Sequence, residues 1–374
     1  MNQRATSEPE AYQTERVGGV PSASGVPAAA GSGAPTAALA SRGRARVALI
    51  GGGTVGAAVV SLLEGRPEFE LVGVLVRDAS RRRAFPHADE LVTADAGVLA
   101  DADVVVEVAG GTGRPADLAL RPLARGLPLV TANKAALAER WDEFLPHARE
   151  GRVHFEAAVM AGTPSVGILA GCLRGSRPLA LHAVLNGTCN VILAAMEQGG
   201  TYGSALGEAQ RLGYAEADPT LDVEGLDAAH KLTVLGRLAF APDLGWPAVR
   251  ARTRGISGLT PDVMERELAR GRHVRLVGSV VPEAGSWTAT VRPVSLPHAH
   301  PLLTTGATNA LLFAGDPIGQ VVVRGPGAGG GATASGVVAD LSAAVGGVPG
   351  PLPLREAAPV PIAGPAASEA LEEP

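Results

Sequence analysis

Short apolar segments alternate with glycine-rich or charged ones along most of the chain from residue 44 onward. Residues 47–50 form a continuous apolar run, which is typical of a strand buried on both faces of a parallel sheet. A glycine-rich turn and a predicted helix over residues 54–64 follow directly. Strands that alternate with helices indicate an α/β fold with a doubly wound parallel sheet. The alternation continues with predicted strands over residues 70–76, 103–108, 127–131 and 153–156, and with helices after Pro115 and over residues 134–150.

The pattern changes near residue 164, where a second, α+β domain is predicted to begin and to extend to residue 324. Its predicted elements are a long helix over residues 221–240 and antiparallel strands over residues 179–184, 274–281 and 287–294. A second glycine-rich segment, residues 325–331, precedes a helix predicted over residues 333–345. We expect this helix to pack back on the first domain, so that residues 43–163 are completed by about residues 325–346.

Both ends of the chain have the composition of disordered segments. Residues 1–42 are rich in Ala, Gly, Ser and Pro and predict a disordered leader, because they offer too little apolar surface to offset the entropy of ordering. Glycines and Pro35 interrupt the small-residue stretch over 27–40, which also lacks a basic flank, so a signal peptide is disfavoured. Residues 347–374 predict a disordered Pro-rich tail.

Composition narrows the class of protein. Hydrophobic residues make up 46% of the chain and charged residues 18%, which is typical of a globular protein, and aromatic residues only 3%, so Ala, Val and Leu must build the core. A formal net charge of −5 disfavours nucleic acid as a partner, and no apolar run is long enough to span a bilayer. Two cysteines without metal-ligand spacing indicate reduced thiols. We therefore expect a cytoplasmic protein.

The first motif with a chemical meaning is the series Gly51, Gly53 and Gly56, which follows a predicted strand and opens a predicted helix. Gly51 allows a tight turn, Gly53 lets the backbone approach a pyrophosphate, and Gly56 lets helix and strand pack closely. The N-terminus of the helix attracts the anion. A purely structural glycine turn is the alternative, but the strand–turn–helix context favours a Rossmann-type dinucleotide-binding domain.

A basic run at the end of the second predicted strand bears on the choice of nicotinamide cofactor. Arg77 follows Val76, and residues 81–83 are all arginine. Cationic groups at this position suit the 2′-phosphate of NADP. A solvated arginine run is the alternative interpretation, and Asp78 keeps NAD open because an acid there can bind the ribose hydroxyls of NAD.

Polar groups that could act on a substrate lie in three further segments. Lys134 follows a parallel strand, and ligands bind at the carboxyl ends of such strands. Residues 213–231 concentrate carboxylates in an otherwise apolar part of the chain, and Asp227 and Lys231 share one helix face because they are four residues apart. The alternatives are a surface lysine and a capped helix with an exposed ion pair. Residues 186–190 are a polar cluster, for which the alternative is a helix cap formed by Thr188 or Asn190.

With these motifs in place, the chain resembles the homoserine dehydrogenase family, in the form without a C-terminal regulatory ACT domain. The resemblance covers about residues 46–341, and the block over residues 213–231 is its most specific part. The matching segments, in the family's order and spacing, are residues 51–56, 131–134, 156–164, 186–190, 213–231, 275–278 and 325–329.

The resemblance implies an activity, the NAD(P)H-dependent interconversion of L-aspartate 4-semialdehyde and L-homoserine in threonine, methionine and isoleucine biosynthesis. Lys231 would be the general acid and base, Lys134 a second cation near nicotinamide and substrate, and Asp222 a group that positions Lys231. Glu216 and Asp227 would hold the substrate ammonium, and Asn186, Gly187 and Thr188 would complete the substrate site. The implied cofactor-binding residues are Gly51, Gly53, Thr54, Val55, Gly56, Arg77, Thr112, Lys134, Gly213, Gly327 and Gly329.

The resemblance also implies a sodium ion and a homodimer. The ion would bind the carboxylate region of Glu156 and the main-chain oxygens of Val159, Ala161 and Thr163, since hard oxygen ligands suit such a cation. A strand-to-loop turn is the plainer interpretation of this segment. The dimer would form through the second domain, and without an ACT domain we expect weak threonine inhibition.

Two other functions stay open at this point. One is another Rossmann amino-acid dehydrogenase that acts on a related substrate. The other is a non-catalytic nucleotide-binding regulator, which the presence of Lys231 together with its carboxylate neighbours argues against.

Overall fold

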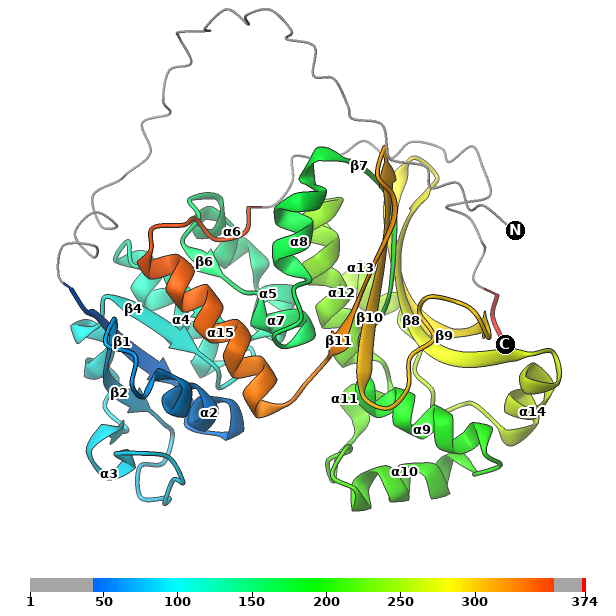
Figure 1. Cartoon of the computed structure of the whole chain (residues 1–374), viewed down its shortest axis with the longest axis horizontal. Coiled ribbons are helices and arrows are strands. Elements are labelled where there is room, and N and C mark those ends of the chain that lie inside the picture. Colours follow the sequence, from blue (N-terminus) through cyan, green and yellow to red (C-terminus); the bar gives the residue numbers. More distant parts are fainter. Residues whose placement is uncertain (1–42, 353–371) are drawn as a thin grey trace, which may run out of the picture. The chain divides into compact units, whose positions relative to one another are not determined.

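The structure is a computed structural model that describes residues 43–352 and 372–374 (Figure 1). The predicted leader, residues 1–42, lies outside the described residues, and so do residues 353–371 of the predicted tail. In the part of the tail that is described, the backbone N–H of Ser295 donates to the carbonyl of Glu372 at 2.9 Å. No helix in the described part of the chain has both the length and the apolar character needed to cross a bilayer.

The first sheet has six strands, all paired in parallel, in the order β3-β2-β1-β4-β5-β6. This order is that of the Rossmann fold, and the predicted doubly wound sheet is confirmed. The strand β3 was not predicted, because it is only two residues long and pairs at the edge of the sheet. The strands are β1 (Ala45–Ile50), β2 (Phe69–Leu75), β3 (Val92–Thr93), β4 (Val104–Glu107), β5 (Leu129–Thr131) and β6 (Val153–His154).

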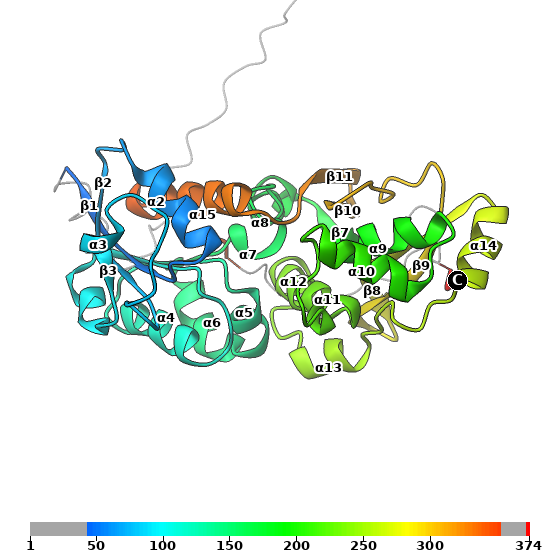
Figure 2. The same ribbon diagram turned by 90° about the horizontal axis from the view of Figure 1, so that it is seen from below.

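Helices cover both faces of this sheet, as Figure 2 shows. On one face, Val47 and Leu49 of β1 pack with α2 (Thr54–Leu63) and α15 (Gly330–Val345). On the other face, Ala48 and Ile50 pack with α4 (Arg114–Ala124), α5 (Lys134–Glu139) and α6 (Trp141–Arg149). Successive side chains of a strand point to opposite faces, so the part of β1 that lies between the two helix layers, residues 47–50, is apolar at every position. The α15 helix packs against α2 and against the strands β4 and β5.

The single helix predicted over residues 134–150 is interrupted. Arg140, with φ −120° and ψ 28°, separates α5 from α6. Its guanidinium donates to the carbonyl of Thr112 at 2.7 Å and to the carboxylates of Asp117 and Glu143. The contacts of Arg140 therefore stabilise the break between the two helices. Helical propensity alone predicts that Arg140 lies inside one continuous helix.

The second sheet has five antiparallel strands in the order β11-β10-β7-β8-β9. Three of them were predicted, whereas β10 and β11 were missed, and β11 takes part of the predicted glycine-rich loop. The pairing of β7 with β10 joins Val184 to Ala310. Because these residues are far apart in the sequence, the local hydrophobic pattern does not predict their pairing. The strands are β7 (Arg177–Val184), β8 (Arg272–Glu283), β9 (Ser286–Pro297), β10 (Thr308–Asp316) and β11 (Gly319–Pro326).

One helix of the second region, α12 (Leu226–Ala239), is buried on every side: each residue from Asp227 to Ala239 is buried. The helix predicted over residues 221–240 is divided by Gly225, at φ 79°, into α11 (Thr220–Val223) and α12. The α12 helix packs against the helices α5 and α8 (Val166–Ala170) and against the strands β8 and β9. The other short elements are α3 (Ala88–Leu91), the 3-10 helices η1 (Ala96–Asp101) and η2 (Cys172–Gly175), α7 (Ala157–Met160), α8 (Val166–Ala170), α9 (Gly187–Glu197), α10 (Tyr202–Arg211), α13 (Trp246–Ala251) and α14 (Pro261–Ala269).

A buried arginine joins α12 to α5. The guanidinium of Arg237 donates to the carbonyls of Leu137 and Ala138, at 2.7 and 2.8 Å, and to the carbonyl of Leu244 at 2.8 Å. The two α5 carbonyls lie in the last turn of that helix, where a cation is favourable. Burial lowers the pKa of Arg237 to about 10, so the group still carries its charge at neutral pH.

Arg237→Ala should destabilise the fold by about 3 kcal/mol, because it leaves three buried carbonyls without a donor and each such loss costs about 1–3 kcal/mol, partly offset by no longer burying a charge. Denaturant unfolding measures the difference. The matched control is Arg250→Ala, since Arg250 is exposed at the end of α13. Equal unfolding free energies for the two variants would contradict the role given to Arg237.

Candidate active site

The glycine-rich turn lies at the carboxyl end of β1 and leads into α2. Gly51 has φ 110°, and a Cβ on it would come 2.7 Å from the backbone nitrogen of Ala109. A Cβ on Gly56 would come 2.0 Å from the carbonyl oxygen of Gly51. Both positions therefore require glycine for the reasons that the sequence suggested. The turn borders a cleft of about 590 Å³ at the carboxyl edge of the sheet.

Four arginines line this cleft: Arg77, Arg81, Arg83 and Arg114. The buried Nε of Arg83 has no hydrogen-bond partner among the described residues. Asp78, the acidic residue that could have bound the ribose hydroxyls of NAD, does not line the cleft. Its carboxylate accepts from the backbone N–H and the hydroxyl of Ser80. Positive charge is thus available where the cofactor's ribose is expected. Sequence reasoning did not single out Arg114, which opens α4.

The second glycine-rich segment comes close to the first. A Cβ on Gly330, the first residue of α15, would come 2.9 Å from Cγ2 of Thr54, the first residue of α2. Two helix N-termini therefore meet beside the cleft, and both favour an anion. Thr112 lies after β4, with its carbonyl held by Arg140, whereas Gly213 lies in an exposed turn after α10.

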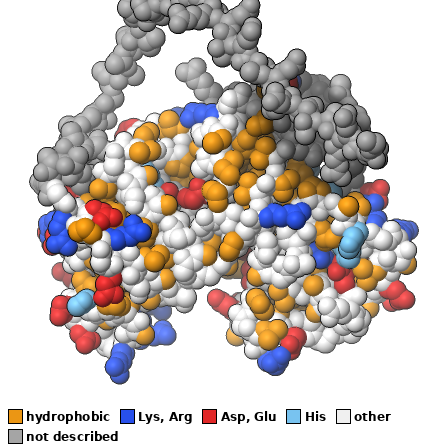
Figure 3. All heavy atoms as spheres, viewed as in Figure 1, with side chains coloured by type: hydrophobic (Ala, Val, Ile, Leu, Met, Phe, Trp, Pro, Cys, Tyr) orange, Lys and Arg blue, Asp and Glu red, His pale blue; other side chains and the backbone are white. Residues whose placement is uncertain are grey.

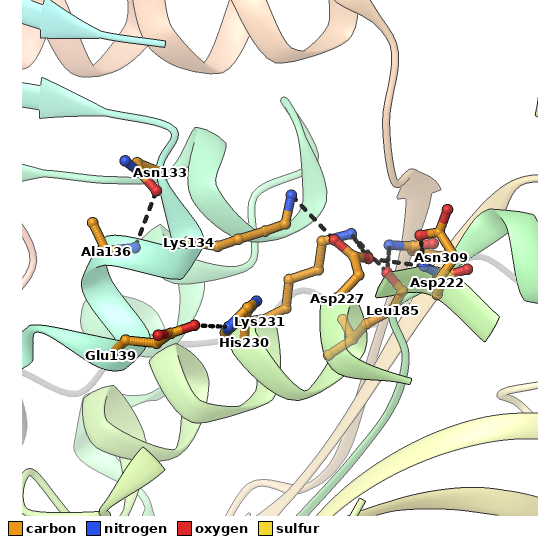
Figure 4. A network of polar contacts seen from close by, with 11 residues as sticks. Asn133, Lys134, Ala136, Glu139, Leu185, Asp222, Asp227, His230, Lys231 and Asn309 are labelled. Carbon is orange, nitrogen blue, oxygen red and sulfur yellow. Dashed lines mark hydrogen bonds and ion pairs between the residues drawn. The ribbon is translucent and has the colours of Figure 1, made fainter. Parts of the chain in front are cut away.

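Lys134 and Lys231 meet at one carboxylate (Figure 4). Nζ of Lys134 lies 3.1 Å from Oδ1 of Asp227, and Nζ of Lys231 lies 2.9 Å from Oδ2. The side chain of Lys231 is 9% exposed and that of Lys134 is 37% exposed, so only Lys134 has substantial access to solvent. Lys231 also donates to the carbonyl of Leu185 at 2.8 Å. The Asp227–Lys231 pair is therefore buried rather than exposed, and Lys134 joins it as a partly exposed lysine.

Ionisation of this cluster is set by competing effects. Burial opposes the charge on Asp227, but the ammonium groups of Lys231 and Lys134 hold its pKa well below its usual range. The charge of Asp227 in turn raises the pKa of Lys134. Asp222 behaves differently: burial, reinforced by nearby Asp227, raises its pKa, although the amide of Asn186 donates to it. The cluster therefore holds a firmly ionised carboxylate between two lysines.

Asn186 links the two carboxylates. Its Nδ2 lies 2.6 Å from Oδ1 of Asp222 and 2.9 Å from Oδ2 of Asp227, while its Oδ1 accepts from the N–H of Cys189. The residue that caps α9 is therefore Asn186 rather than Thr188 or Asn190, and the same side chain bridges two carboxylates. Gly187 opens α9, where a Cβ would come 2.8 Å from the carbonyl of Ala307.

The structure does not bring Glu216 into the cluster. Glu216 is exposed, and its main-chain carbonyl accepts from Nε2 of Gln210 at 3.0 Å. Thr188 reaches the same loop by donating to the carbonyl of Tyr214 at 2.9 Å. The loop over residues 213–218 is therefore attached to α9, beside the lysine cluster, with the carboxylate of Glu216 on its exposed side.

Glu107 was not singled out from the sequence. It ends β4, is fully buried, and accepts from the N–H groups of Ala109 and Gly110 and from the hydroxyl of Thr131. Burial raises its pKa. Asn133, which caps α5, donates to the carbonyl of Gly111 in the same loop. This network fixes the loop after β4 against the residue that precedes Lys134.

The predicted sodium segment forms a loop between α7 and α8. The Glu156 carboxylate accepts N–H groups of Ser165 and Val166 at Oε1 and of Gly167 at Oε2, so it holds the start of α8. Oε2 has one donor and keeps acceptor capacity. Among the described residues, no N–H group donates to the carbonyls of Ala161 and Thr163. Oxygen atoms suited to a hard cation are therefore present, although no group of three or more His, Cys, Asp or Glu side chains in the described part could hold a metal.

The position of the lysine cluster defines the class of protein. Titratable lysines at the carboxyl edge of a dinucleotide-binding sheet are what a dehydrogenase needs to combine hydride transfer with proton transfer. Two family models match the chain: "Homoserine dehydrogenase, NAD binding domain" over residues 51–158 and "Homoserine dehydrogenase" over residues 164–342.

Known proteins give the same result. The homoserine dehydrogenase of Pseudomonas aeruginosa is 39% identical over 311 residues, which are 79% of this chain and 71% of that protein. The homoserine dehydrogenase of Bacillus subtilis is 35% identical over 314 residues, 80% of this chain and 72% of that protein. The chain belongs to the homoserine dehydrogenase family, and it is an oxidoreductase rather than a non-catalytic regulator.

Solved structures also resemble it. A homoserine dehydrogenase from Thiobacillus denitrificans superposes with a TM-score of 0.75 at 36% identity, covering 81% of this chain and 73% of that one. A hyperthermophilic archaeal homoserine dehydrogenase in complex with NADPH superposes with a TM-score of 0.68 at 27% identity, covering 83% of this chain and 100% of that one.

Asp227→Asn should lower stability by about 3 kcal/mol at pH 7, because it leaves buried Lys231 without its counter-ion. The folded-state pKa of Asp227 is depressed, so its contribution is present above the unfolded value near 4 and is lost as the pH falls toward the folded value. Denaturant unfolding at pH 7 and at pH 3 should therefore show a gap to wild type that narrows at the lower pH. Asp243→Asn, at an exposed site, is the control; a gap independent of pH would contradict the assignment.

Proposed function

We propose that this chain interconverts L-aspartate 4-semialdehyde and L-homoserine with NADPH. The observation that carries the proposal is the Lys134–Asp227–Lys231 cluster, which lies at the carboxyl edge of the dinucleotide-binding sheet. A bound nicotinamide supplies or accepts the hydride. The residues of the chain must then bind the amino-acid substrate and move one proton at the oxygen of C4.

Lys231 is the proton carrier in this proposal. Its ammonium has three N–H groups. Two are used by the carbonyl of Leu185 and by Oδ2 of Asp227, which leaves the third for the substrate oxygen. In aldehyde reduction Lys231 gives its proton to the forming alkoxide, and in alcohol oxidation its neutral amine takes the hydroxyl proton.

The charged residues around Lys231 are assigned roles according to the contacts that they already make. Both carboxylate oxygens of Asp227 are engaged by lysines, so we assign Asp227 to the orientation of Lys231 and Lys134, beyond its expected contact with the substrate ammonium. Lys134, the more exposed lysine, would bind the developing charge on the substrate from the nicotinamide side. Glu216 would bind the substrate ammonium from the loop that Thr188 holds, and Asp222 would support Lys231 through Asn186.

The preference for NADP rests on the arginines of the cleft. Arg77, Arg81 and Arg83 line the cleft and would pair with the two negative charges of a 2′-phosphate, whereas Asp78 does not line it. We also propose a homodimer that forms through the second sheet, because its edge strand β11 is largely exposed and presents Val322 to solvent. The face shown in Figure 3 carries acidic and basic side chains in small separate groups.

Lys231→Ala should retain NADPH binding and lose about a hundred- to ten-thousand-fold of turnover, the usual contribution of general acid–base catalysis. Lys231→Arg should be similarly poor, since arginine stays protonated and cannot act as a base. Steady-state rates in both directions, NADPH affinity and thermal melting are measured on the same samples. Near-normal turnover of folded Lys231→Ala would remove Lys231 from the mechanism and make Lys134 the next candidate.

NADPH should bind more tightly than NADH, and Arg77→Ala should weaken NADPH binding by about tenfold while leaving NADH binding nearly unchanged, because a charge-assisted hydrogen bond to the 2′-phosphate is lost. Fluorescence titration gives the four dissociation constants. Arg82→Ala is the matched control, because Arg82 belongs to the same run and does not line the cleft. Tighter binding of NADH by the wild type would defeat the arginine argument and leave the fold assignment intact.

Sodium should stabilise the protein through the loop of Glu156, Val159, Ala161 and Thr163, since a ligand that binds only the folded state raises its stability. The melting temperature is compared in sodium chloride and in choline chloride at equal ionic strength. A melting temperature that is the same in both salts would count against a sodium site. This readout does not depend on the assay of turnover.

A further inference from the structure

Asn309 lies at the point where the β7–β10 ladder ends and the active site begins. The ladder's last pair toward the site is Ala310 with Val184. One step further, the Nδ2 of Asn309 donates to the carbonyl of Leu185 at 3.0 Å. The side chain thus replaces the backbone donor that a continued ladder would have supplied, and Asn309 is fully buried.

The same carbonyl holds the proton carrier. Leu185 O accepts from Nζ of Lys231 at 2.8 Å as well as from Asn309 (Figure 4). A carbonyl oxygen has two lone pairs, so these two donors use its full capacity. Leu185 also directly precedes Asn186, whose amide joins Asp222 to Asp227. The position of one carbonyl therefore affects the whole lysine–carboxylate cluster.

On its other side, Asn309 contacts the second glycine-rich loop. A Cβ on Gly327 would come within 2.2 Å of all three amide atoms of Asn309, so only glycine lets the loop lie on this side chain. The Oδ1 of Asn309 is buried and has no hydrogen-bond partner among the described residues. The side-chain amide of Asn309 therefore contacts two parts of the site. One is the glycine loop at Gly327, and the other is the Leu185 carbonyl that accepts from Lys231.

We propose that Asn309 is a positioning residue that fixes the Leu185 carbonyl, and through it Lys231, against the glycine loop over residues 325–331. The proposal rests on the proposed function only for the direction of the turnover readouts. Loss of the Asn309 donor frees the strand end, and with it the Leu185 carbonyl, to move away from Nζ of Lys231. Asn309 does not itself touch the reacting atoms.

The test compares Asn309→Leu with Asn190→Leu. Asn190 is an equally buried asparagine whose Nδ2 bonds Thr304 and Thr308 and whose Oδ1 is likewise without a partner among the described residues, so it controls for the loss of a buried amide. We expect Asn309→Leu to lose about tenfold or more in kcat, the effect of one lost hydrogen bond on the barrier, with the dissociation constant of NADPH changed by less than about threefold. Asn190→Leu should lose stability only.

A second variant keeps the shape of the side chain. A protonated carboxyl can donate to Leu185 O and an ionised one cannot, so Asn309→Asp should keep turnover at acidic pH and lose it as the pH rises. Asn190→Asp should lack that dependence. Equal turnover losses in the Asn309 and Asn190 variants, or a pH profile of Asn309→Asp that runs parallel to wild type, would overturn the proposal.

The outcome stays separable from the proposed function. If the wild-type protein turns over neither homoserine nor the semialdehyde, the proposed function fails, and the positioning role is then decided by a crystal structure of Asn309→Leu. Displacement of Lys231 Nζ from hydrogen-bond distance of Leu185 O supports the proposal. An unchanged Lys231–Leu185–Asp227 arrangement refutes it.

Discussion

The carboxylate of Asp227 is the group on which the rest of the site depends, because two lysines from different helices share it. Lys134 is the first residue of α5. Lys231 lies on α12, the buried helix that also carries Asp227. Two ammonium groups this close would repel each other without an anion between them. The fold must therefore hold α5 and α12 at a fixed separation, and the buried guanidinium of Arg237 does this by donating to the last carbonyls of α5.

The helix α12 satisfies two demands that usually conflict. It is buried on every side, as the central helix between two sheets, yet it carries Asp227 and Lys231. Buried charges are tolerated when they are paired and hydrogen-bonded. Pairing inside the helix at a spacing of four, with added contacts to Asn186 and Leu185, meets that condition. The same contacts orient Lys231, so the arrangement that stabilises the charge also prepares it for proton transfer.

Three buried residues missed from the sequence share one feature, which is that each is a single polar group at the end of an apolar run or inside one. Glu107 closes the run of β4, Asn309 precedes the run of β10, and Arg237 stands alone in an apolar stretch of α12. A lone polar residue in an otherwise buried segment must find partners, and this is a signal that the sequence does contain. What it cannot give is the partner, since Asn309 bonds Leu185 across 124 residues and Arg237 bonds Leu137 across 100.

The sequence by itself determined the parallel sheet, the glycine turn and the pairing of Asp227 with Lys231, because each depends on local rules: the apolar period of a strand, the backbone freedom of glycine and the four-residue repeat of a helix. Tertiary structure alone decided that Lys134 joins the same carboxylate, that Arg140 divides the helix of α5 and α6, and that Glu216 stays on the exposed side of its loop. Those outcomes depend on distances between segments far apart in the chain. Packing of α12 between the second sheet and the helices α5, α7 and α8 fixes such distances, and no periodicity along the chain encodes them.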